Sequence, residues 1–344
     1  VAAGAPPPAG AEVIDCSGMV VIPGLIDVQA RAHADRGAAR PAQEWRYETA
    51  LDFGVTTLLD TSAGTTAALP QAERAAVGLQ VGPRVLATGD PLLGARSAEE
   101  ARLHVQRRRA AGAHSIKVHP TAPRTQRQWY AAACRAEGLR CIAEAADTGH
   151  ALTLLLDGYD IIEHAIPYTP SYADVLSLWA QSGAAAATLL ATPDGLQGDN
   201  FYFQFSNPID DPRLLRHHPR RALDEMAWRR AVLARDWSFQ SSARDTAALQ
   251  DAGAAVALGS GGRVQGLGVH WELWAMAGPG AMTPYAALQV ATISSARAVG
   301  LDHEVGTVEA GKRADLIVLA ADPLEDIRSS TQIALVIHDG MLRE

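Results

Sequence analysis

The sequence predicts an α/β fold, a (β/α)8 TIM barrel with a small β-sandwich formed from the N- and C-terminal segments. Short β-rich runs alternate with helical patterns, which is typical of βα units and a parallel sheet. Eight such runs can be counted, and 344 residues suit a barrel of ~250 residues with a small addition. We therefore expect the barrel at 23–301 and the β-sandwich at 1–22 together with 302–344.

Turn signals such as Pro23-Gly24 and Gly82-Pro83 separate the expected barrel strands. The strands are Leu25–Val28, Val55–Asp60, Arg84–Thr88, Ser115–His119, Arg140–Glu144, Asp160–His164, Ala184–Leu190 and Ala254–Ser260. A helix is expected over Ser97–Ala111, where Glu99 and Glu100 suit the positive end of the helix dipole. The run in the 180s is so rich in alanine that its pattern alone does not separate strand from helix.

Strand patterns also lie at both ends of the chain. Before the barrel, Glu12–Cys16 and Met19–Ile22 are expected as short strands around a turn at Ser17-Gly18. After the barrel, Ile333–Ile337 is followed by Asp339-Gly340, a strong hairpin signal. We expect these terminal strands to pair and to form the β-sandwich.

Composition excludes several classes of protein. Hydrophobic residues make up 48% and charged residues 20%, and no apolar run approaches the ~20 residues of a membrane span. The formal net charge of -8 argues against a nucleic-acid partner, because phosphate backbones favour clustered Lys and Arg. Three cysteines without CxxC spacing indicate neither a disulfide framework nor a zinc site. We expect a cytoplasmic protein with a small-molecule substrate, no membrane partner, and a fold compatible with a homodimer.

Motifs along the chain resemble those of the amidohydrolase superfamily. PGLID at 23–27 is similar to the family's first barrel strand, and GVTTLLDTS, VGPRVLATG and IIEHA are similar to its strands 2, 3 and 6. The tail GTVEAGKRADLIVLAADPL resembles the family's ending. RTQRQ, GLGVHWELW and MTPYAALQVAT resemble, more narrowly, the branch often fused to a Tol-type β-propeller, although the propeller itself is not in this sequence.

The resemblance implies six metal-ligand positions, and this sequence departs from the family's pattern at three of them. The two histidines of strand 1 are replaced by Gln29 and Arg31, and the Asp or His after strand 8 is replaced by Gly261. The other three positions hold Lys117, Glu144 and His164. With Lys117 uncarboxylated, this is a poor set of zinc ligands. We therefore expect no cofactor, and Zn or Mn at Glu144, His164 and Lys117 if a metal binds.

An internal cation is expected to stand in for the missing ion. The guanidinium of Arg31 would lie near the vacated metal position, where Glu144 could accept it bidentately. Glu144 and His164 are then the candidate acid/base pair, and Arg31 or Lys117 would stabilise an oxyanion. The candidate substrate-binding residues are Gln29, His119, Arg124, Phe201, Tyr202 and His270. The aromatic run at 201–205 is either a wall at the catalytic mouth or a plug under a long loop.

Three classes of function remain open. The favoured one is a metal-free enzyme that performs acid/base chemistry on a small organic molecule, as cyclisation, dehydration, isomerisation or atypical hydrolysis, in specialised metabolism. The first alternative is a conventional metal-dependent hydrolase of C–N bonds. The second is a non-catalytic descendant that binds a ligand. Metal analysis of protein purified without chelator, together with the structure around strand 1, distinguishes these classes. Bound zinc or manganese indicates the metal-dependent hydrolase, a metal-free pocket closed by side chains indicates the non-catalytic descendant, and an open metal-free pocket indicates the metal-free enzyme.

Overall fold

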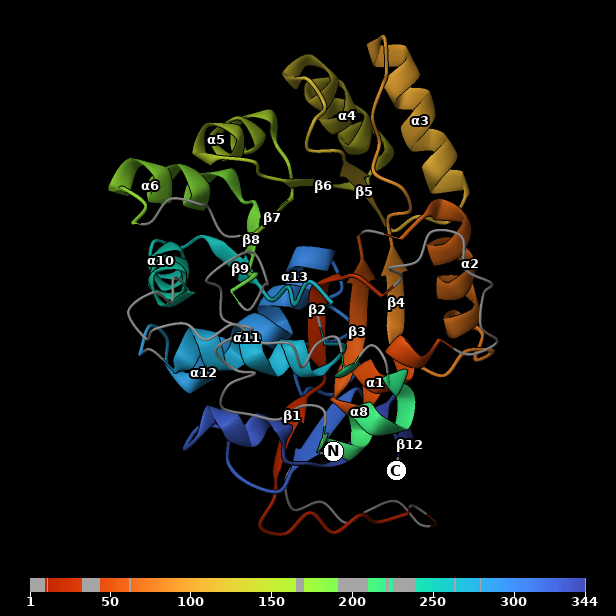
Figure 1. Cartoon of the computed structure of the whole chain (residues 1–344), viewed down its shortest axis with the longest axis vertical. Coiled ribbons are helices and arrows are strands. Elements are labelled where there is room, and N and C mark those ends of the chain that lie inside the picture. The colour runs from red at the N-terminus through yellow and green to blue at the C-terminus, as the bar shows by residue number, and fades with distance from the viewer. Residues whose placement is uncertain are drawn as a thin grey trace.

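A computed structural model describes residues 10, 12–32, 44–61, 63–164, 170–190, 210–220, 223–224, 239–262, 264–278 and 280–343. Within these ranges, eight parallel strands form a barrel that helices surround, and a four-stranded antiparallel sheet lies at one end (Figure 1). The α/β fold class predicted from the sequence is confirmed. The division into domains at residues 22 and 302 stays a prediction.

The barrel strands fall into two parallel sheets that meet at both edges. They are β2 (Leu25–Ala30), β3 (Val55–Asp60), β4 (Arg84–Ala87), β5 (Ser115–Val118), β6 (Arg140–Glu144), β7 (Ile161–Glu163), β8 (Ala185–Ala187) and β9 (Ala255–Ala257). His114 N donates to Ala87 O at 2.9 Å between β4 and β5, and Val28 N donates to Leu258 O at 2.8 Å between β9 and β2. These bonds close the barrel.

The helices follow the strands in sequence and cover the outside of the barrel (Figure 1). They are α1 (Trp45–Asp52), α2 (Thr65–Ala76), α3 (Ala98–Ala110), α4 (Arg124–Glu137), α5 (Thr148–Asp157), α6 (Ala173–Ser182), α8 (Pro212–His217), α10 (Phe239–Asp251), α11 (Leu267–Ala277), α12 (Pro284–Gln289) and α13 (Ser295–Val299), with a π-helical turn η3 (Val290–Ser294). Side chains cap several of them: Ser97 accepts from Glu100 N at the start of α3, and Asp147 accepts from His150 N at the start of α5. None of the helices in the described ranges is long and apolar enough to cross a membrane.

The barrel interior is a small apolar core. It contains Ile26, Val28, Leu59, Ile142, Ile161, Ala185, Ala187 and Ala257, and α13 adds Ala296, Ala298 and Val299 to the same cluster. Because strand side chains alternate between the two faces, a residue two positions beyond an interior one faces the interior again. Glu144 follows Ile142 in this way, and Glu163 follows Ile161. The sequence therefore directs two carboxylates into the C-terminal end of the barrel.

The terminal segments form a sheet in the order β1-β10-β11-β12. Its strands are β1 (Val20–Pro23), β10 (Leu316–Leu319), β11 (Ile333–His338) and β12 (Met341–Arg343), and a 3-10 turn η4 (Ile327–Thr331) precedes β11. The expected hairpin turn is present, since Asp339 and Gly340 both have positive φ. The strand expected at Glu12–Cys16 is wrong: Val13 is 69% exposed, and the segment pairs with no strand in the described ranges.

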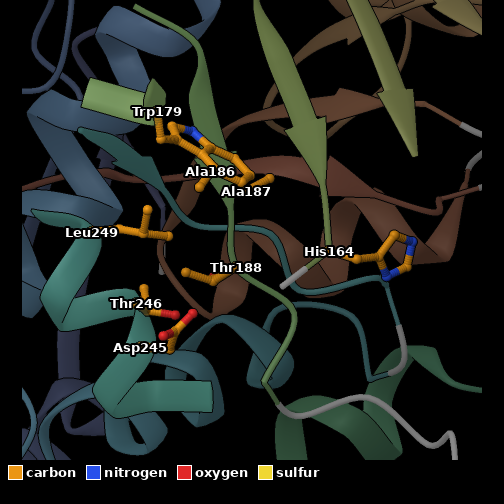
Figure 2. A pocket seen from close by; sticks show the side chains of 8 residues that line it. All are labelled: His164, Trp179, Ala186, Ala187, Thr188, Asp245, Thr246 and Leu249. Atoms are coloured by element: carbon orange, nitrogen blue, oxygen red, sulfur yellow. The ribbon is translucent and has the colours of Figure 1, made fainter. Parts of the chain in front are cut away.

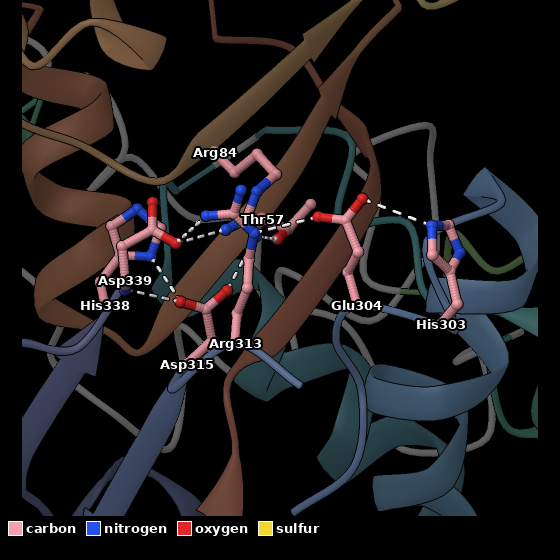
Figure 3. A network of polar contacts seen from close by, with 8 residues as sticks. All are labelled: Thr57, Arg84, His303, Glu304, Arg313, Asp315, His338 and Asp339. Atoms are coloured by element: carbon pink, nitrogen blue, oxygen red, sulfur yellow. Dashed lines mark hydrogen bonds and ion pairs between the residues drawn. The ribbon is translucent and has the colours of Figure 1, made fainter. Parts of the chain in front are cut away.

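A charged network joins this sheet to the N-terminal end of the barrel (Figure 3). From the first position of β4, Arg84 donates to Asp315 Oδ2 and to Asp339 Oδ1, both at 2.8 Å. His338 Nδ1 lies 3.0 Å from Asp315 Oδ1. Burial alone would raise the pKa of Asp315, but the contact with His338 and the charge of Arg84 outweigh it and lower that pKa to about 2.

Candidate functional site

Three charged side chains converge at the C-terminal ends of neighbouring strands: Lys117 on β5, Glu144 on β6 and Glu163 on β7. Glu144 and Glu163 are directly opposite each other in the sheet register. Two like charges in this arrangement repel each other and destabilise the fold. Lys117 Nζ lies 2.6 Å from Glu163 Oε2 and 3.8 Å from Glu144 Oε2. The Lys117 and Glu163 side chains are 4% and 0% exposed. A buried ammonium therefore compensates the two carboxylates.

A more exposed pair lies beside these buried groups. His164 Nε2 is 3.2 Å from Glu144 Oε1, and the two side chains are 24% and 33% exposed. His164 has a φ of 72°, which is uncommon for a residue other than glycine. In a regular strand Glu163 and His164 would face opposite sides. The left-handed backbone at His164 lets both side chains reach the same cluster.

Gln29 reaches the cluster from the other side of the barrel, at the end of β2. Its Nε2 donates to Glu163 Oε2 at 3.1 Å and lies 3.3 Å from His164 Nε2. The β2–β3 register shifts between Asp27 and Ala30, and such irregularities change the direction of nearby side chains. Gln29 is fully buried, so it acts within the cluster and not at its surface.

Asp27 and Gly259 position this part of β2. The Asp27 carboxylate accepts hydrogen bonds from Gln29 N, from Ser260 N and from Ser260 Oγ. Burial raises the pKa of Asp27, although the bonds from Ser260 oppose the shift. A Cβ atom on Gly259 would lie 2.7 Å from Thr188 O and 2.8 Å from Gln29 Cβ. Glycine is therefore needed where β9 approaches Gln29.

Glu144 is ionised at neutral pH. The hydrogen bond with His164 lowers its pKa most strongly; partial burial opposes this, and the charges of Lys117 and Arg31 add to it, so that the pKa of Glu144 falls to about 2. A permanent carboxylate beside an imidazole orients the ring.

Arg31 does not take the place expected for it. Its side chain is exposed, and although its charge helps to lower the pKa of Glu144, the structure contains no ion pair between these two described residues. The expectation of a bidentate Arg31–Glu144 pair is wrong, because Lys117 already compensates that carboxylate from inside the barrel. The internal cation of this barrel is an ammonium.

The remaining candidates have other contacts or lie outside the described residues. His119 Nδ1 contacts Thr121 Oγ1 at 2.8 Å just beyond β5, and Arg124 pairs with Asp157 at 3.0 Å between α4 and α5. Phe201 and Tyr202 lie outside the described residues. Of the predicted set, the structure brings together Gln29, Lys117, Glu144 and His164, with Arg31 nearby.

His270 is a core histidine in α11. It is fully buried, its Nε2 is 2.9 Å from Phe53 O, and its Nδ1 is 3.0 Å from Ser330 Oγ. Since both ring nitrogens have protein partners and the ring is inaccessible, it is not placed to contact a substrate. Burial lowers its pKa to about 4.

Glu163 was missed by the sequence analysis. In the motif IIEHA, the resemblance pointed to His164 as the site residue. Glu163 lies two positions after Ile161, so the alternation of a strand places its side chain on the same interior face. A buried carboxylate needs a partner of opposite charge. The need for a cationic partner and the alternation of strand side chains could together have predicted the Glu163–Lys117 pair.

A cavity of about 10 Å³ borders His164 on the outer side of β8, enough for one water molecule. Trp179 of α6 and three residues of α10 line it, and Figure 2 shows the His164 ring pointing away from these side chains. One of the three, Asp245, already accepts from Ser171 N at 2.5 Å and from Ser171 Oγ at 2.7 Å. The cavity is a packing gap behind the barrel wall.

A divalent metal ion does not fit the residues as they are arranged. Ligand atoms of Glu144, Glu163 and His164 lie within 4.8 Å of one another, and three protein ligands can form a catalytic metal site. However, Glu163 Oε2 already accepts from Lys117 and Gln29, and His164 Nε2 faces Glu144. An ion at this position would lie against the Lys117 ammonium.

Residues 234–342 match the model of the amidohydrolase family. The chain is also similar to 5-methylthioadenosine/S-adenosylhomocysteine deaminases from Symbiobacterium thermophilum, with 35% identity over 63 residues, and from Moorella thermoacetica, with 51% identity over 41 residues. These segments span 18% and 12% of this chain, and only 14% and 10% of the two relatives.

Solved structures share the fold over nearly the whole chain. A Xaa-Pro dipeptidase with bound methionine superposes with a TM-score of 0.71 and 20% identity, covering 95% of this chain and 87% of that one. Phenylurea hydrolase B superposes with a TM-score of 0.75 and 20% identity, covering 98% of this chain and 88% of that one. Molinate hydrolase superposes with a TM-score of 0.74 and 16% identity, covering 98% of this chain and 85% of that one. The resemblance to the amidohydrolase superfamily is confirmed, and the narrower resemblance to the Tol-type branch stays a prediction.

Proposed function

We propose that this chain is an enzyme in which Glu144 and His164 act as an acid/base pair on a small organic substrate, without a divalent metal. The observation that supports this most strongly is the 3.2 Å contact between the two side chains, both partly exposed. The pair lies at the C-terminal end of the barrel strands, where active sites of this fold are found.

Each residue of the cluster has a role that follows from its exposure. When His164 Nε2 donates to Glu144, Nδ1 is left to exchange a proton with the substrate, and it has no hydrogen-bond partner among the described residues. Lys117 is too deeply buried to reach a substrate and instead holds the two carboxylates in place. Arg31 is exposed and supplies positive charge for an anion that develops in the reaction.

Hydrolysis, cyclisation, dehydration and isomerisation all require the proton transfers that this pair can provide. The names of similar proteins favour hydrolysis of a C–N bond as the first reaction to assay. A suitable panel therefore contains Xaa-Pro dipeptides, phenylureas and 5-methylthioadenosine, followed by substrates that cyclise or isomerise.

A conventional metal-dependent hydrolase of C–N bonds is the second candidate. It is favoured by the grouping of Glu144, Glu163 and His164, and by the buried Glu163 Oε1, which has no hydrogen-bond partner among the described residues. Zinc or manganese would be held by these three side chains after Lys117 moved or lost its charge.

The test is turnover on this panel by the wild-type protein and by the variants Glu144→Gln and His164→Gln. Because His164 exchanges the proton and Glu144 holds and orients its ring, each variant should lose roughly 10²–10⁴-fold in kcat while its circular dichroism spectrum stays unchanged. Matched controls are Glu309→Gln and His303→Gln, whose side chains are 62% and 70% exposed and which should keep wild-type kcat. Full activity in Glu144→Gln would refute the proposal, and ligand binding without turnover would indicate a non-catalytic protein.

A further inference from the structure

Lys117 is unusual in this chain by type and by location. The sequence has 30 Lys and Arg residues, and the only lysines are Lys117 and Lys312. Lys117 has a side chain exposed by only 4%, although lysine is among the residue types least often buried. A lysine ammonium is a compact point charge, closer in shape to a metal ion than the planar guanidinium is. Inside the barrel the basic residue of this cluster is a lysine, whereas almost all other basic residues of the sequence are arginines.

The Lys117 ammonium contacts two carboxylates that also belong to the possible metal-ligand group. Lys117 Nζ lies 2.6 Å from one carboxylate and 3.8 Å from the other, on two adjacent strands. The same two carboxylates and His164 form the group whose ligand atoms lie within 4.8 Å of one another. Glu144 and Glu163 would repel each other across the sheet without a cation. The ammonium thus satisfies the electrostatic requirement that a divalent ion would otherwise meet.

We propose that Lys117 is the resident cation of this barrel and prevents divalent ions from binding. Glu144, Glu163 and His164 then become a divalent-cation site only when the charge of Lys117 is removed. Carboxylation of Lys117 would be unfavourable, because it would convert the cation into an anion beside two carboxylates. The inference concerns the same residues as the proposed function. It can be tested separately, because metal binding is measured without a substrate.

The experiment is calorimetric titration with MnCl₂ and ZnCl₂, together with melting temperatures in chelator and in excess metal. Wild-type protein should show no stoichiometric binding and no metal-dependent shift in melting temperature. Lys117→Met should melt below the wild type in chelator, bind one ion, and regain stability with metal, because the ion replaces the missing charge. In the double variant Lys117→Met/Glu163→Gln, affinity should fall by roughly tenfold or more as a ligand is lost.

Lys312→Met is the matched control. Lys312 lies 3.9 Å from Glu309 and is remote in sequence from the cluster, so this variant should titrate like the wild type. The comparison also removes the contribution of metal bound by surface histidines. A folded Lys117→Met protein that binds no more metal than Lys312→Met would overturn the inference, and so would stoichiometric binding by the wild type.

A measurement on the wild type covers the case in which Lys117→Met does not fold. Carbon-13 NMR in labelled bicarbonate should show no carbamate carbon beyond that of the N-terminal α-amine, because Lys117 remains an ammonium. A carbamate signal that is retained in Lys312→Met, and that is distinct from the carbamate of the N-terminal α-amine, would assign carboxylation to Lys117 and overturn the inference. Failure of the proposed function has a different signature: Glu144→Gln would keep turnover, while the metal titrations would be unaffected.

Discussion

The candidate site depends on single residues whose backbone conformation or missing side chain makes room for the cluster. His164 has positive φ, and this one conformation brings two consecutive side chains to the same cluster. Strained backbone is retained where the surrounding structure fixes it, often at functional sites. Gly259 contributes in a different way, since its missing side chain makes room for Gln29.

Gly259→Ala should lower the free energy of unfolding by about 1–3 kcal/mol. The new methyl group would lie 2.7 Å from a backbone oxygen of Thr188 and 2.8 Å from Gln29 Cβ, and neither atom is the flexible end of a side chain. Chemical denaturation measures the change. Gly149→Ala is the control, because its Cβ meets only Asp147 Oδ1 at 3.4 Å, and equal losses in the two variants would contradict this explanation.

At the scale of elements, α11 is buried on all sides, and every residue from Leu267 to Met276 is buried. A helix that is buried all around must satisfy its polar side chains internally. His270 does this by bridging the residue after α1 to η4, through Phe53 O and Ser330 Oγ. Glu272 does so by accepting from Leu190 N at 3.0 Å.

His270 should make the protein less stable in mild acid. Its pKa is lowered by burial from 6.5 to about 4, so between these values the unfolded chain binds a proton that the folded protein does not. The free energy of unfolding therefore falls as the pH decreases through this window, by about 2 kcal/mol between roughly pH 7 and pH 5.

His270→Gln keeps an amide donor and acceptor but does not titrate, so denaturation curves of this variant should depend less on pH over the same range. His114 and His218, whose pKa values burial also lowers to about 4, account for the remaining slope. An unchanged slope in His270→Gln would show that His270 is not a source of the acid sensitivity.

At the scale of the whole molecule, the terminal sheet and the candidate site lie at opposite ends of the barrel. The Arg84 and Asp315 network attaches the terminal sheet to the N-terminal ends of the strands (Figure 3). The Lys117, Glu144 and His164 cluster lies at their C-terminal ends. This separation is typical of the fold, in which loops after the strands carry function.

Local patterns were sufficient to predict the barrel but not the full site. Strands such as Val55–Asp60 and Arg140–Glu144 were predicted with their observed bounds, because turn residues and β-rich composition are local signals. The directions of Arg31 and Lys117 depend on contacts between distant segments, so the sequence alone assigned the internal cation to the wrong residue. Glu12–Cys16 has the composition of a strand but lacks a neighbouring strand to pair with.

Turnover after removal of metal tests the proposed acid/base chemistry most directly. The wild-type protein is treated with chelator, its metal content is measured, and kcat is determined with the best substrate from the panel. We predict an unchanged kcat in metal-free protein and no increase when zinc or manganese is added. Loss of activity on chelation, with recovery on adding either metal, would contradict the metal-free mechanism.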